Sequence, residues 1–177
     1  IAEEAADESL WAFQAITKPA PPKVKQADWP RDDLDRFVLA RMEKEKLQPA
    51  TAATQKVLIR RLYYDLTGLP PSTEQVERFA KAHRRNSQKA TEELVDELLG
   101  SPQFGVRWGR HWLDVARYGE SNGDDGLGRN ASFPHAWRYR DYVIDAFNRD
   151  TPYDRFLTEQ IAGDLLPFKN DLERDRQ

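Results

Sequence analysis

Apolar side chains recur along most of this sequence every three or four residues, which is the spacing of an amphipathic α-helix. Leu34, Phe37, Val38 and Met42, for example, fall on one face of a helix predicted from about residue 32 to 46. The same criterion predicts helices over 54–67, from Ser72, from Ser87, over 103–118, from Ser132 to about Asn148, and from Thr151 to before Pro167. No stretch of useful length alternates as a half-buried strand would. The pattern therefore predicts an all-α fold, a single domain of about seven helices.

Local signals at the helix ends agree with these boundaries. Gly68 is placed to close the second helix, and Ser72 with Gln75 forms a capping box that opens the third. Ser87 is the predicted cap of the fourth.

The predicted helix over 103–118 has an unusually narrow polar side. When its residues are placed at intervals of about 100°, the polar ones occupy a strip about 80° wide. They are Gln103, Arg107, Arg110, Asp114 and Arg117. Apart from His111 at the edge of the strip, the rest of the circle is apolar, aromatic or small. We expect such a helix to be covered on most sides, as the central buried helix of the domain.

Proline and charge divide the chain into three parts. Residues 1–28, which contain Lys18-Pro-Ala-Pro-Pro-Lys23, are expected to form an extended N-terminal arm or linker, because the prolines cannot continue a helix. The helical domain is predicted over 29–168, and 169–177 is a charged tail. Trp11 and Phe13 are expected to anchor the arm or to meet a neighbouring domain. Because Ile1 is not an initiator methionine and no signal peptide is visible, we expect a piece of a longer protein.

Composition excludes several classes of function. The 27 basic and 30 acidic side chains give a net charge of -3, which argues against general nucleic-acid binding. No apolar run approaches the roughly 20 residues that a membrane span requires. With no cysteine, the chain can form no disulfide, no thiolate metal site and no covalent attachment to haem.

Polar side chains interrupt the apolar faces of the last two predicted helices. Arg140 falls among apolar residues, and Gln160 and Asp164 fall within the arc predicted to be buried, which Tyr153, Phe156, Leu157 and Ile161 form. A buried charge is costly unless it is paired, so we expect an inward Arg140 to pair with Asp164 or Asp114. One interpretation is a set of structural ion pairs. The other is a catalytic pocket of His111, Asp114, Arg140 and Asp164, supported by Gln160 and Arg110, in which His111 carries protons.

The loop after residue 118 is rich in oxygen donors and glycine. Glu120, Asn122, Asp124 and Asp125 are hard ligands suited to Ca²⁺ or Mg²⁺, although the spacing does not match an EF-hand. A glycine-rich connection beside a ligand site is the alternative interpretation. Nearby aromatic residues could line a cleft for sugar or for a haem edge, but core packing is the default explanation. They are Trp108, Trp112, Tyr118, Trp137, Tyr139 and Tyr142.

Several long motifs resemble one known family. They are Asp35-Arg-Phe-Val-Leu-Ala-Arg41, Leu58-Ile-Arg-Arg-Leu-Tyr-Tyr-Asp-Leu-Thr-Gly-Leu-Pro-Pro71, Arg107-Trp-Gly-Arg-His-Trp-Leu-Asp-Val-Ala-Arg-Tyr118, Ala136-Trp-Arg-Tyr-Arg-Asp141 and Gln160-Ile-Ala-Gly-Asp-Leu-Leu166. In this order they resemble the planctomycete cytochrome-c-associated domain, a family of uncharacterised function, over about 29–167. The loop Asp124-Asp-Gly-Leu-Gly-Arg-Asn130 departs from the family's pattern.

The resemblance implies context more than chemistry. Such domains occur in large exported bacterial proteins, after a c-type cytochrome domain and before a second uncharacterised domain. We therefore expect an interaction or scaffold module, located in the periplasm or cell envelope, whose partners are the neighbouring domains; any haem belongs to a separate domain. The competing hypotheses are a hydrolytic or oxidative enzyme domain acting on carbohydrate, and a divalent-metal module that uses loop 119–130.

Overall fold

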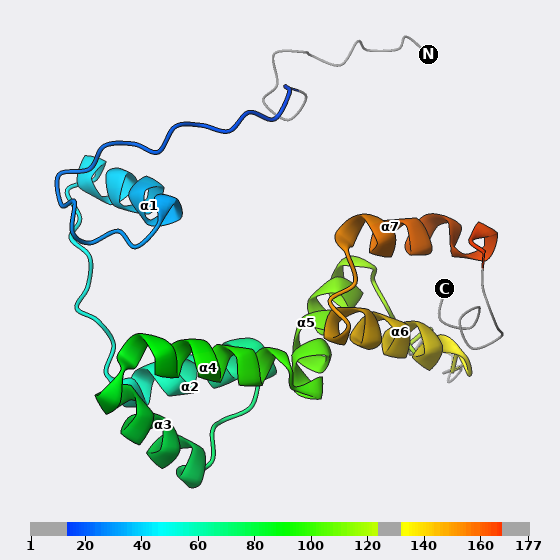
Figure 1. Cartoon of the computed structure of the whole chain (residues 1–177). Coiled ribbons are helices and arrows are strands. Elements are labelled where there is room, and N and C mark those ends of the chain that lie inside the picture. Colours follow the sequence, from blue (N-terminus) through cyan, green and yellow to red (C-terminus); the bar gives the residue numbers. More distant parts are fainter. Residues whose placement is uncertain (1–13, 124–131, 168–177) are drawn as a thin grey trace. The chain divides into compact units, whose positions relative to one another are not determined.

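The computed structural model describes residues 14–123 and 132–167, and these ranges form seven α-helices (Figure 1). They are α1 (Asp33–Lys44), α2 (Gln55–Thr67), α3 (Thr73–Arg85), α4 (Ser87–Leu99), α5 (Pro102–Val115), α6 (Ala136–Asn148) and α7 (Tyr153–Ala162), followed by the 3₁₀ turn η2 (Gly163–Leu165). Apart from one antiparallel bridge between Ser121 and Ser132, these ranges contain no β pairing. The predicted all-α fold is confirmed.

Helix ends follow the local signals closely. Gly68 closes α2 in the left-handed conformation, with φ 71°. The capping box predicted for α3 is present, since the Ser72 side chain accepts from the Gln75 amide and the Gln75 side chain accepts from the Ser72 amide. The predicted cap of α4 is wrong by one residue. Asn86 is the N-cap, and Ser87 is already helical. Either side chain can cap, so the backbone conformation decides between them.

Three positions next to helix ends adopt the left-handed conformation without being glycine. Lys46, Arg117 and Asp150 have φ of 57°, 54° and 51°. After each one the chain closes the helix with a backbone bond that reaches five residues back, as from the Tyr118 amide to the Leu113 carbonyl at 2.9 Å. This closure ends α5 three residues before the predicted boundary.

The chain divides into two compact units, Ile1–Ala52 and Ala53–Gln177. In the first unit, Leu39 of α1 is buried. The Glu43 carboxylate of α1 accepts the backbone N–H of Lys25 at 2.9 Å and that of Gln26 at 3.1 Å. These charge-assisted bonds hold the segment after the proline cluster against α1.

The second unit has two apolar clusters. The first joins α2, α3 and α4 through Ile59, Tyr63, Phe79, Ala90, Leu94 and Leu98. The second joins α6 and α7 through Val143, Ala146 and Phe156, with Trp112 and Leu113 of α5 packed against them. Among the described residues, no helix has the length and apolar character needed to cross a bilayer.

α5 lies between these clusters, but it is much less buried than its pattern predicts. Gly105 and Gly109 are its only buried residues, while Val106, Trp108 and Val115 are exposed. The prediction that most sides of this helix are covered is therefore wrong. The covered side is formed by the two glycines, so α5 makes its closest contact through backbone and leaves large side chains outside it.

Candidate functional site

The close crossing of α5 and α6 positions the side chains of the candidate site. The Gly105 amide donates to Asn148 Oδ1 at 2.8 Å, and Asn148 Nδ2 donates to the Pro102 carbonyl at 3.2 Å. A Cβ atom at Gly105 would collide with the Ile144 carbonyl oxygen and would lie 2.6 Å from Asn148 Cγ. Only glycine allows this approach, which brings the aromatic face of α5 against α6 and α7.

A row of hydrogen bonds joins α5, α6 and α7. Trp112 Nε1 donates to the Tyr139 hydroxyl at 2.9 Å, and that hydroxyl donates to Gln160 Oε1 at 2.6 Å. The buried Phe156 ring packs edge-on against Trp112 at 4.8 Å and parallel to Tyr142 at 5.8 Å. Gln160, expected to point inward, therefore has an aromatic partner on α6, and the row holds α7 in register with α5 and α6.

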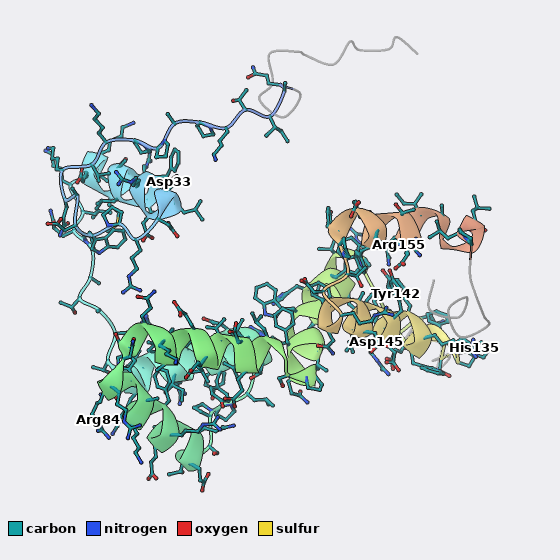
Figure 2. The ribbon with its side chains drawn as sticks, in the orientation of Figure 1. Asp33, Arg84, His135, Tyr142, Asp145 and Arg155 are labelled. Atoms are coloured by element: carbon teal, nitrogen blue, oxygen red, sulfur yellow. The ribbon has the colours of Figure 1, made fainter. Side chains whose placement is uncertain are left out.

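A second polar contact joins α6 to α7. The Tyr142 hydroxyl donates to Glu159 Oε2 at 2.9 Å, and Arg155 Nε lies 2.6 Å from Glu159 Oε1. Figure 2 shows Tyr142 and Arg155 in the space between the two helices. Burial, followed by the Glu159 carboxylate, raises the pKa of Tyr142 to about 12. The apolar pattern does not point to Glu159, although its spacing four residues after Arg155 is a signal for this ion pair.

Arg140 belongs to a third polar group, at the surface. Its Nη1 pairs with Glu120, and its Nε donates to Asp141 Oδ1 at 3.1 Å. The hydrogen bond to Asp141 raises the pKa of Arg140. The Tyr118 hydroxyl donates to Glu120 Oε1 at 2.9 Å, and partial desolvation, with this hydrogen bond, raises the pKa of Tyr118. The Arg140 side chain is 37% exposed, so these are solvated ion pairs.

The expected buried pairing of Arg140 with Asp164 or Asp114 is therefore wrong. Both aspartates are exposed, and neither forms an ion pair with Arg140 in the structure. The reason lies in the chain before α6. The Phe133 amide donates to the Glu120 carbonyl at 2.8 Å, which holds Glu120 beside Arg140. A carboxylate from the loop thus takes the place expected for one from a helix.

The remaining catalytic candidates do not gather with Arg140. His111 is exposed, and its ring lies edge-on to Trp108 at 5.4 Å. Arg110 is also exposed on α5. Asp164 follows α7 in the turn η2. Within the described ranges, no hydrogen bond or ion pair joins any two of the four predicted catalytic residues.

The predicted metal site is described only in part. Glu120 and Asn122 are placed, whereas Asp124 and Asp125 lie outside the described residues. In the part of the chain that is described, no three acidic or histidine side chains are grouped as metal ligands. Arg140 and Tyr118 both contact the Glu120 carboxylate, so a cation would have to compete with them for it.

The second unit contains a pocket of about 260 Å³ between α5, α6 and α7. It is lined by Phe104, Trp112, Ala146, Phe147, Asp150, Thr151, Tyr153 and Phe156. Rings form most of its wall, and Asp150 is its only charged residue. None of the four catalytic candidates contributes to it. Sequence reasoning identified Trp112 as aromatic but missed Asp150, whose position depends on the turn between α6 and α7.

A row of apolar side chains follows α7 from the rim of this pocket. Tyr153, Leu157 and Ile161 are spaced four residues apart in α7 and so lie along one side of it, and Leu165 follows in the turn η2. Tyr153 is 67% exposed, Ile161 83% and Leu165 80%. Of the arc predicted to be buried, only Phe156 is buried. The prediction for Tyr153 and Ile161 is wrong, because α7 turns Phe156 toward Trp112 and leaves Tyr153, Ile161 and Leu165 exposed, with Leu157 half-buried. These four side chains are hereafter called the α7 row.

These features define an all-α module that presents an apolar row and an aromatic pocket, with most of its ion pairs at the surface and the Glu159 carboxylate nearly buried beside Arg155. The chain belongs to PSCyt2, the family described as "Protein of unknown function (DUF1549)", whose model matches residues 33–177. No curated protein and no solved structure matches the chain. Membership of an uncharacterised family is thereby confirmed, whereas the cytochrome association and planctomycete origin stay predictions.

Proposed function

We propose that this domain is an interaction module of a larger exported protein and that it packs against neighbouring domains, including a c-type cytochrome domain. The α7 row carries the proposal. Single exposed apolar residues are common on protein surfaces, but a continuous apolar face is typical of a contact with another protein surface. Here Ile161 and Leu165 are almost fully exposed at adjacent turns.

The energetics support a covered α7 row. Burying a large aliphatic side chain contributes about 1.5–3 kcal/mol, so Ile161 and Leu165 together would contribute a few kcal/mol to an interface. Tyr153 adds an aromatic ring with a hydroxyl, a combination enriched at the centre of interfaces. The family resemblance supports the choice of partner, since related domains follow a c-type cytochrome domain, and it supports export.

An enzyme domain is less well supported. Acid–base catalysis requires the participating groups to lie within hydrogen-bond reach of the same reacting atoms. His111 and Asp114 are exposed on α5, Asp164 lies in η2, and Arg140 is engaged by Glu120 and Asp141, with no hydrogen bond or ion pair joining any two of the four in the described ranges. The pocket between α5, α6 and α7 offers rings and one carboxylate, a combination better suited to binding.

The proposal is tested by titrating the 177-residue chain with a c-type cytochrome domain taken from the same full-length protein, followed by calorimetry. We expect binding that Ile161→Asp or Leu165→Asp weakens by at least tenfold, because each places a charge in an apolar contact. Val106→Asp on α5 is the matched control, since Val106 is also exposed and lies outside the α7 row. Absence of binding, or equal weakening by the control, would contradict the proposal.

A further inference from the structure

The pocket between α5, α6 and α7 has the size of one large side chain. Its volume is about 260 Å³. An apolar cavity of about 150 Å³ accepts benzene, whereas sites for drug-sized ligands and cofactors begin at about 300 Å³. A phenyl or indole group therefore suits the space better than a cofactor does. The rings of Phe104, Trp112 and Phe156 offer it edge-on and stacked contacts.

The Asp150 carboxylate lies at the edge of the pocket without a paired cation among the described residues. Asp150 is exposed, and its carboxylate forms no hydrogen bond or ion pair with the side chains that the structure describes. The neighbouring cation, Arg149, instead donates from Nε to the Asp145 carbonyl at 3.3 Å. The Asp150 amide donates to the Phe147 carbonyl at 3.1 Å, so the turn fixes the backbone of Asp150 and keeps its carboxylate near the aromatic wall. That place favours a cationic group next to the inserted ring.

We infer that the pocket receives one aromatic side chain of a partner protein, carried next to a Lys or Arg that pairs with Asp150. The inference rests on the proposed interaction function and names the chemistry of the partner segment. Tyr153 both lines the pocket and begins the α7 row. One continuous segment of the partner can therefore place its aromatic ring in the pocket and then cover Ile161 and Leu165. An aromatic anchor in a pocket with a polar rim is the usual centre of such an interface.

The test uses three blocked dipeptides: acetyl-Trp-Lys-amide, acetyl-Trp-Glu-amide and acetyl-Ala-Lys-amide. Binding to the 177-residue chain is followed by the NMR signal of the Trp112 indole N–H, assigned with Trp112→Phe. We expect millimolar binding of Trp-Lys, about threefold to fivefold weaker binding of Trp-Glu, in line with an exposed ion pair, and no response to Ala-Lys.

Two aspartate variants distinguish an effect of the Asp150 charge from an effect on folding. Asp150→Asn should remove the preference for Trp-Lys over Trp-Glu, and it should fold normally because asparagine tolerates φ of 51°. Asp145→Asn, in α6 and outside the pocket, should keep the preference. Equal binding of Trp-Lys and Trp-Glu, an equal response to Ala-Lys, no response to any peptide, or an equal effect of both variants would each overturn the inference.

The two proposals fail in different ways. If the dipeptides bind as expected but the cytochrome domain does not, the pocket inference stands and the proposed partner is wrong. If the cytochrome domain binds through the α7 row but no dipeptide moves the Trp112 signal, the interaction function stands and the anchored ring is wrong.

Discussion

The contact between α5 and α6 yields a sharp prediction, because its two glycines differ in one measurable respect. A Cβ atom at Gly105 would collide with the Ile144 backbone carbonyl and with Asn148. A Cβ atom at Gly109 would meet Val143 Cγ1 at 3.4 Å, an ordinary van der Waals contact. Both glycines are buried within the same helix, so Gly105→Ala and Gly109→Ala form a matched pair.

The expected magnitudes follow from three contributions. Alanine in place of glycine stabilises a helix by about 0.5–1 kcal/mol at either position. At Gly105 the helices must separate, which costs about 1–3 kcal/mol as overpacking, and the bond from the Gly105 amide to Asn148 weakens by about 0.5–1.5 kcal/mol. Gly105→Ala should therefore lower the free energy of unfolding by about 0.5–4 kcal/mol. Gly109→Ala should leave it unchanged or raise it by up to about 1 kcal/mol.

Urea unfolding followed by far-UV circular dichroism measures both variants. The dependence of the unfolding free energy on urea must stay the same for the comparison to hold. Asn148→Ala in the Gly105→Ala background should recover little stability, because the Ile144 carbonyl belongs to the backbone and remains in place. If Gly105→Ala proves as stable as Gly109→Ala, the close approach of α5 and α6 is not as described and the reasoning is refuted.

Four further changes test other parts of the molecule. Arg117→Gly should leave stability unchanged or raise it by up to about 1.5 kcal/mol, since it relieves a left-handed residue costing about 1–2 kcal/mol and restores about 0.5–1 kcal/mol of chain entropy to the unfolded state. Ala116→Gly should destabilise, and the reverse order of stability in urea would contradict this. Arg140→Ala should cost no more than about 1 kcal/mol, as expected for exposed pairs, and a loss of several kcal/mol would restore the buried-pair hypothesis. Because the pKa of Tyr142 is about 12 in the folded chain and 10.0 is the ordinary value, its contribution to stability is complete below pH 10 and is lost as the pH rises through about 12. Thermal melts across this pH range should show the wild type losing stability relative to Tyr142→Phe. Melting temperatures that fall in parallel for the two proteins would be inconsistent with the raised pKa. Glu43→Gln should speed hydrogen exchange at the Lys25 and Gln26 amides by weakening charge-assisted bonds, and unchanged exchange would refute that role.

The candidate site was predicted less well than the fold. Periodicity identified the inward position of Gln160, and core packing is the default explanation for Trp112 and Tyr139. The structure joins these three side chains in one row of hydrogen bonds. Periodicity did not identify Glu120 as the partner of Arg140. That pairing joins residues 20 positions apart and depends on a loop held beside α6. Side-chain periodicity within one helix contains no information about such a loop.

The sequence by itself determined the all-α class, the approximate helices and most of their ends. These features depend on interactions within a few residues, such as the capping box at Ser72 and the left-handed Gly68, which are the same wherever the helix lies. Tertiary structure decided which faces are covered. The sequence marks an apolar face on α7, but Phe156 is buried and Ile161 exposed because the rotation of α7 is set by contacts with Trp112, Tyr139 and Tyr142. Burial depends on the relative placement of distant segments, and because the apolar residues of α7 cover a wide arc, more than one rotation satisfies the local pattern.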